Sequence, residues 1–151
     1  MLRWIVAAIH LFGLGLGLGA VWARGRALRG ELDTAGLRRA FYADTWWGAA
    51  AGLWIATGAL RAFAGLEKGS AYYLHNHLFW AKMGLLMVIL VLEIGPMVTL
   101  IRWRRALASG QPVDTHLAPR LARISFLQAG LILLMVLAAT GMARGYGAAS
   151  P

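Results

Sequence analysis

Four long runs of apolar residues constrain the fold of this chain more than any other feature of its sequence. They cover about residues 3–23, 43–64, 78–101 and 122–143. A helix that crosses the bilayer needs roughly 20 such residues, because the hydrocarbon core is about 30 Å thick. Lipid offers the backbone no hydrogen-bond partner, so each run is expected to be helical. We therefore predict an all-α fold, a single transmembrane domain over 1–151 that forms an antiparallel four-helix bundle.

Composition also favours lipid as the surroundings of these helices. Apolar residues make up 60% of the chain, and the net charge is +9. A soluble domain of this size would expose much apolar surface to water, at about 25 cal/mol per Å². The basic residues lie between the apolar runs and form no extended face that could follow phosphates, which argues against nucleic-acid binding. The absence of cysteine excludes disulfides, thiol catalysis and covalent c-type haem.

The distribution of arginine predicts how the chain is oriented in the membrane. Most arginines lie in the two segments that follow the first and third runs. They are Arg24, Arg26, Arg29, Arg38, Arg39, Arg102, Arg104, Arg105, Arg120 and Arg123. Basic loops stay in the cytoplasm, so both termini are expected on the periplasmic side of a bacterial inner membrane. Thr34 is expected to cap a short surface helix between the first two runs.

Glycines in the first run recur at helical spacing. Gly13 and Gly17 form one small-xxx-small pair, and Gly15 and Gly19 form another. Such pairs let helices approach closely, within one chain or in a homodimer. Gly13 and Gly17 also share a face with His10, so the alternative is that they make room for a flat cofactor.

Three ionisable residues inside the runs are candidates for function, since such groups are costly in a bilayer. His10 is either a haem or metal ligand or a structural histidine bonded to a neighbouring helix. Lys82 either extends to the headgroups or points inward and pairs with a carboxylate such as a haem propionate. Glu93 is expected to be protonated and to bond to Gln128 at similar depth, with a proton relay as the alternative. Lys82 and Glu93 are the candidate catalytic residues.

The outer half of the predicted bundle gathers most of the candidate ligands. His10, Arg61 and Lys82 map there, together with His75 and His77 in the loop before the third run. A histidine ligand with cations for two propionates is what a b-type haem requires, so we predict haem b and a redox function, with a quinone or another redox partner. A second possibility is copper handling, with the thioethers of Met83, Met87 and Met142 and either His75 or His77 as Cu(I) ligands. His10 and His77 are the candidate metal-binding histidines. A third possibility is a non-catalytic membrane subunit.

Four segments carry a resemblance to a bacterial family of uncharacterised four-helix membrane proteins, over nearly the whole chain. They are RWIVAAIHLFGLGLGLGAVWARGRAL, DTWWGAAAGLWIATGALR, GLEKGSAYYLHNHLFWAKMGLLMVILVLEIGPM and RISFLQAGLILLMVLAATGMARG. The first-run histidine with its glycines, and FWAKMGLLMVILVL, also look similar to HemJ-type protoporphyrinogen oxidases and the copper-resistance D membrane family. That resemblance implies haem binding by His10 and an essential role for Lys82. Trp22-Ala23-Arg24 stands where the HemJ type has Leu-Pro-Arg, a departure that bears on the oxidase activity more than on haem binding.

Overall fold

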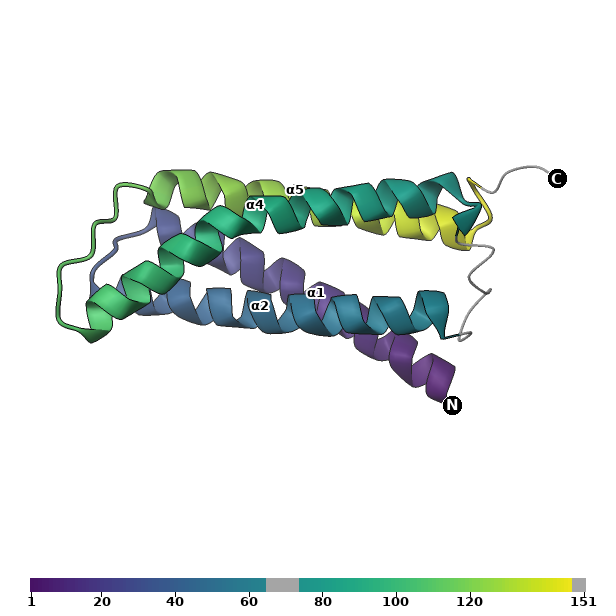
Figure 1. The fold of residues 1–151 in the computed structure, drawn as a ribbon, viewed down its shortest axis with the longest axis horizontal. Coiled ribbons are helices and arrows are strands. Elements are labelled where there is room, and N and C mark those ends of the chain that lie inside the picture. Colours follow the sequence, from purple (N-terminus) through teal and green to yellow (C-terminus); the bar gives the residue numbers. More distant parts are fainter. Residues whose placement is uncertain (65–73, 148–151) are drawn as a thin grey trace.

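The fold is an all-helical bundle, as the sequence predicts. The computed structural model describes residues 1–64 and 74–147, and within these ranges it contains four helices. They are α1 (Leu2–Arg29), α2 (Thr34–Phe63), α4 (His77–Ala108) and α5 (Ala118–Ala143). Successive helices run in opposite directions (Figure 1). We call the end that holds Leu2 and His77 the outer end and the opposite end the inner end, following the predicted orientation.

Three of the helices are long and apolar enough to cross a membrane. These are α1, α4 and α5. Helix α2 covers the predicted second span but is not among them. Its sequence explains why, because its first part carries the charges of Arg38, Arg39 and Asp44, and the part that follows is rich in tryptophan and glycine, which have low hydropathy. The crossing of the bilayer by α2 therefore stays a prediction.

The start of α2 differs from the expectation. Asp33, not Thr34, caps the helix, and its carboxylate accepts a hydrogen bond from the Gly36 N–H at 2.7 Å. The short surface helix that we predicted is the first part of α2, which continues without a break into the second apolar run. Carboxylates are among the preferred N-caps, because they accept from the unpaired N–H groups of the first turn.

A polar layer divides the interior of the bundle. The apolar cluster toward the outer end includes Val21, Trp47, Trp54 and Ile132. The cluster toward the inner end includes Leu28, Leu37, Leu100 and Leu121. Each helix places at least one polar or charged side chain between these clusters, namely Arg24, Asp44, Glu93, Ser125 and Gln128.

The order of packing makes α1 the central helix. It contacts both α2 and α5, and α5 in turn contacts α4, whereas α2 and α4 barely touch. Pro96 lies buried within α4, and the helix changes direction in its second half, toward α2 (Figure 1). A proline inside a helix removes a backbone hydrogen bond and kinks it, which accounts for the bend.

The outer surface carries large apolar side chains along the candidate spans. Phe12 on α1, Val91 on α4 and Leu137 on α5 are each more than 60% exposed. Other large apolar side chains on the same helices, such as Leu11, Met97 and Leu133, are exposed as well. Such a surface is what lipid-facing helices require.

Candidate functional site

His10 is buried where α1 packs against α2. Its Nδ1 lies 2.9 Å from the hydroxyl oxygen of Thr57 on α2. The Thr57 hydroxyl has one proton and bonds to backbone carbonyls of its own helix, at 2.8 Å to Leu53 and 3.1 Å to Trp54. Carbonyl oxygens only accept hydrogen bonds, so the Thr57 hydroxyl donates its proton to one of these two carbonyls. The hydrogen between the two side chains is therefore on Nδ1 of His10, which donates to the Thr57 oxygen. This assignment leaves Nε2 as the ring nitrogen with the lone pair.

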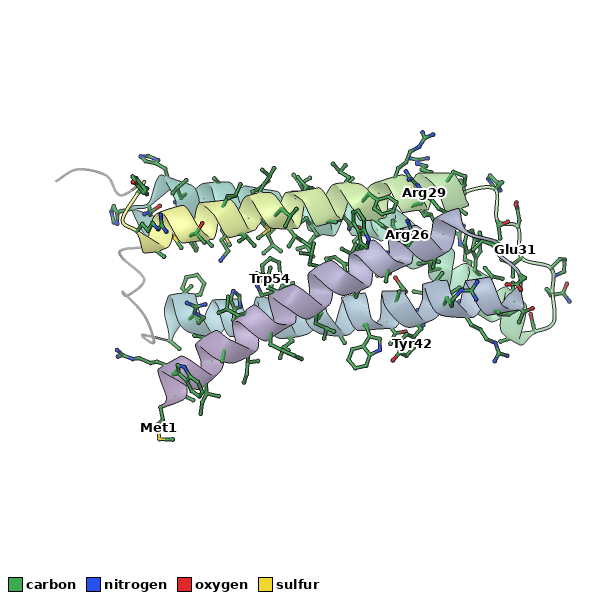
Figure 2. All side chains as sticks on the ribbon, turned by 180° about the vertical axis from the view of Figure 1, so that it is seen from behind. Met1, Arg26, Arg29, Glu31, Tyr42 and Trp54 are labelled. Atoms are coloured by element: carbon green, nitrogen blue, oxygen red, sulfur yellow. The ribbon has the colours of Figure 1, made fainter. Side chains whose placement is uncertain are left out.

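Two further α2 residues hold the imidazole ring. Trp54 stacks on it, with ring centroids 5.7 Å apart and an angle of 29° between the planes. Gly58 lies beside the Cε1 edge of the ring, where an added Cβ would come within 3.3 Å of Cε1 and 3.9 Å of Nδ1. The indole N–H of Trp54 is buried without a hydrogen-bond partner among the described residues. Trp54 lies between the α1–α2 pair and α5 (Figure 2), in the same apolar cluster as Met135 of α5.

Two cations from other helices lie close to this histidine. Lys82 on α4 and Arg61 on α2 are half-buried, and the charges of both act on His10. The two charges also act on each other. The structure therefore brings together His10, Arg61 and Lys82, as the outer-half grouping predicts. His75 and His77 are exposed at the outer end, at the start of α4.

Gly13 and Gly17 lie at the α1–α2 interface. A Cβ on Gly13 would meet Leu53 and the Trp54 backbone at 3.6 Å, and one on Gly17 would meet Ala50 and Trp47 at 3.5 Å. The face that they share with His10 is therefore occupied by α2. These contacts support helix packing, the first of the two alternatives for this glycine pair.

Arg24 is the centre of a second site, the buried ionic layer, which we define as Arg24, Asp44, Glu93, Arg104, Ser125 and Gln128. The Arg24 side chain has no exposed surface. It donates to both carboxylate oxygens of Glu93, at 2.7 and 2.8 Å, and to Asp44 at 2.8 Å. Two parallel bonds to one carboxylate suit the planar guanidinium, and a charged group at this depth requires such pairing.

The remaining members of the ionic layer add further hydrogen bonds, although the buried Nε of Arg104 has no partner among the described residues. Arg24 donates to Ser125 at 3.0 Å and to Gln128 at 2.8 Å, which satisfies all five of its N–H groups. Arg104 donates to the second oxygen of Asp44 at 2.8 Å and to the Phe41 carbonyl at 2.7 Å. Two arginines thus face two carboxylates, and the layer joins all four helices.

Sequence reasoning found part of this layer. The predicted bond between Glu93 and Gln128 is confirmed, at 2.8 Å. Glu93 also accepts two hydrogen bonds from Arg24, a pairing that the sequence analysis did not predict. Arg24 was assigned to the basic loop, and Asp44 was missed. The sequence did contain a signal for this pair, because Arg24 and Asp44 carry opposite charges and lie at the inner ends of two consecutive apolar runs.

The described part of the chain contains few clustered side chains that could bind a metal ion. Residues 1–64 and 74–147 contain no group of three or more histidine, cysteine, aspartate or glutamate side chains that could hold a metal ion. Of the methionines proposed for copper, Met87 is 60% exposed and Met83 is half-buried. Copper handling stays a prediction.

A comparison with protein families identifies the chain. The model of DUF2214, described as a predicted membrane protein, matches residues 2–147. The chain belongs to the DUF2214 family. This match confirms the predicted resemblance to an uncharacterised family of membrane proteins, and all four described DUF2214 helices fall within it. Searches of curated proteins and of solved structures find no match.

Proposed function

We propose that this DUF2214 protein binds a b-type haem through Nε2 of His10 and takes part in electron transfer within the membrane. The single observation that carries this proposal is the bond from His10 Nδ1 to Thr57 at 2.9 Å, in a buried position. Histidine ligands of metals characteristically donate their other ring N–H to a fixed acceptor, which sets the tautomer and orients the ring. His10 already has that arrangement.

The neighbours of His10 supply the other contacts that a haem needs. Lys82 and Arg61 provide positive charge for two propionates. The unpaired indole N–H of Trp54 provides a hydrogen-bond donor in the same region. A bound haem would contribute a one-electron couple whose potential depends on the axial ligand and on burial. The chain's own part is to hold the ligand nitrogen, to balance the propionate charges and to exclude water.

The experiment is an absorption spectrum of detergent-purified protein from haem-replete cells, before and after reduction. The proposal predicts an intense visible band in the wild type that His10→Ala abolishes. The control is His116→Ala, because His116 is an exposed loop residue bonded to Asp114 at 2.7 Å. Colourless wild-type protein, or a band that survives His10→Ala, overturns the proposal. Circular dichroism of each variant checks that the helices are retained.

A further inference from the structure

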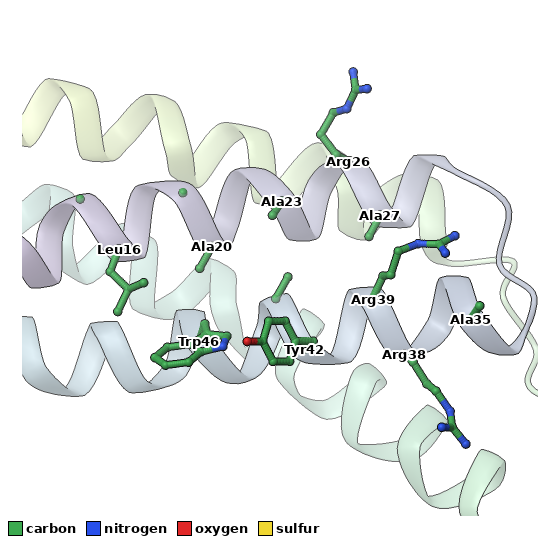
Figure 3. Close-up of a pocket in the computed structure, with 13 residues that line it drawn as sticks. Leu16, Ala20, Ala23, Arg26, Ala27, Ala35, Arg38, Arg39, Tyr42 and Trp46 are labelled. Atoms are coloured by element: carbon green, nitrogen blue, oxygen red, sulfur yellow. The ribbon is translucent and has the colours of Figure 1, made fainter.

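A groove runs along the side of the α1–α2 pair toward its inner end. It has a volume of about 1220 Å³, and its α1 side is formed by small residues such as Gly15, Gly19 and Ala23. A Cβ added to Gly15 or Gly19 would meet nothing within 4 Å, in contrast to Gly13 and Gly17 on the packed side of the helix. In Figure 3, Leu16, Ala20 and Ala23 of α1 point toward α2 across this space. The groove is therefore apolar and open at the surface.

Positive charge gathers at the inner end of the same groove. Arg26 on α1 and both Arg38 and Arg39 on α2 line it. Figure 3 shows Arg39 between the two helices, with Arg26 and Arg38 extending to either side. All three are exposed, and none belongs to the ion pairs of the described residues. They differ in this from Arg24 and Arg104, whose charges are balanced by carboxylates.

Two aromatic residues separate the apolar part of the groove from the arginines. Tyr42 and Trp46 line it from α2, with their rings packed edge to face at 6.2 Å. Such residues favour the level of the lipid headgroups, where one side of the ring is apolar and the other is wet. An occupant must therefore place an apolar chain beside Gly15 and Gly19 and an anionic group beside Arg39.

We infer that this groove binds an anionic phospholipid, with an acyl chain along the small residues of α1 and the phosphate beside Arg39, while Arg26 and Arg38 on either side add positive charge. Arginine suits phosphate because its planar group donates two parallel hydrogen bonds. Basic pockets between membrane helices bind anionic headgroups by this chemistry. A second copy of the chain is a poorer occupant, since a symmetric contact here would bring two sets of three arginines together.

The test measures lipid binding to the purified full-length protein by native mass spectrometry in detergent, with phosphatidylglycerol and phosphatidylcholine of the same acyl chains. We expect phosphatidylglycerol to bind more tightly. The triple variant Arg26→Gln, Arg38→Gln, Arg39→Gln should weaken it by about 100-fold, because each arginine near an anionic lipid contributes roughly a factor of five. Inorganic phosphate as a competitor should not displace the lipid.

A matched control removes the same charge from the other basic segment. Arg102→Gln, Arg105→Gln, Arg120→Gln alters three exposed arginines outside the groove, and binding should change by less than about 3-fold. Gly19→Leu, which fills the apolar part without changing charge, should also weaken binding. Equal loss in both triple variants, equal affinity for the two lipids, unchanged binding in Gly19→Leu or a dimer cross-linked through the groove would each overturn the inference.

Discussion

Arg24 contributes all five of its N–H groups to hydrogen bonds with partners on the three other helices. Replacing it with methionine keeps a long apolar side chain but leaves Glu93 without its bidentate partner. Breaking a buried ion pair from one side costs about 3–5 kcal/mol, because the remaining charge is left uncompensated. We expect Arg24→Met to lower the free energy of unfolding by that amount, measured by thermal unfolding in detergent.

The control for this variant lies two residues away on the same helix. Arg26→Met removes the same charge from an exposed position and should change stability by less than about 0.5 kcal/mol. Adding Glu93→Gln to Arg24→Met should recover part of the loss, since a neutral amide no longer demands a cation. Equal effects of Arg24→Met and Arg26→Met would contradict the ionic layer as described.

Thr57 is a positioning residue in the proposed haem site. Thr57→Val keeps the shape of the side chain and removes the acceptor that fixes His10 Nδ1. Loss of such a supporting hydrogen bond characteristically weakens metal binding by about 10–100-fold. A haem titration of the apoprotein should show this loss, together with a shifted reduction midpoint.

Thr140→Val serves as the matched control for Thr57. The Thr140 hydroxyl also bonds to a backbone carbonyl of its own helix, that of Leu137 at 2.9 Å, but it is exposed. Its substitution should leave both the haem affinity and the midpoint unchanged. If both threonine variants behave like the wild type, Thr57 does not support a ligand at His10.

The residues of the site were predictable only where polarity and depth in the membrane single them out. His10, Lys82 and Glu93 stand inside apolar runs, so their cost in lipid marks them directly. Thr57 and Trp54 are ordinary residues of a membrane helix, and their role depends on the angle at which α2 faces α1. That angle depends on how α1 and α2 pack at Gly13, Gly17 and Gly58. The order of residues in the sequence does not specify this packing.

At the scale of the elements, α1 and α5 are in close contact at Gly25. A Cβ there would lie 3.0 Å from the ring of Phe126 on α5. The ring is also held by Trp22, at a centroid distance of 4.9 Å, and by Arg29, whose guanidinium carbon lies 4.6 Å from the ring centroid. Overfilling a packed contact costs about 1–3 kcal/mol. We expect Gly25→Val to destabilise the protein by that amount, measured by thermal unfolding.

Gly130 on α5 provides the control for Gly25. It is also a glycine within a helix, but an added Cβ would meet nothing within 4 Å. The change from glycine to valine alters helix propensity similarly at both positions, by less than about 1 kcal/mol. Any excess loss at Gly25 therefore reports the α1–α5 contact. Matching losses at the two glycines would show that the helices are not in close contact there.

The helices themselves follow from the apolar runs, but their ends do not. Helix α1 continues past residue 23 through Arg24 to Arg29, and α4 continues past residue 101 to Ala108. The arginines at these ends were read as loop residues because charge marks the edge of the membrane. Charge does not end a helix, however, and a buried layer of ion pairs lets α1 continue with Arg24 inside the bundle.

For the whole molecule, the number of crossings depends on α2. Its first residues lie at the inner end beside the end of α1, and its last residues lie at the outer end (Figure 1). If the bundle is embedded along its length, α2 crosses with α1 despite its lower hydropathy, because its tryptophan-rich face is buried against the other helices. Glu31 and His75, one before α2 and the other after it, should then lie on opposite sides of the membrane.

The natural chain contains no cysteine, so single cysteines can report this directly. Glu31→Cys, Ser109→Cys and His75→Cys are all exposed positions in loops or at helix ends. With an impermeant maleimide on intact spheroplasts, His75→Cys should be labelled, whereas the other two should react only after permeabilisation. Labelling of Glu31→Cys and His75→Cys from the same side would mean that α2 does not cross. Labelling of both Glu31→Cys and Ser109→Cys from outside, with no labelling of His75→Cys, would reverse the orientation, and the arginines of the α1–α2 groove would then face the other leaflet.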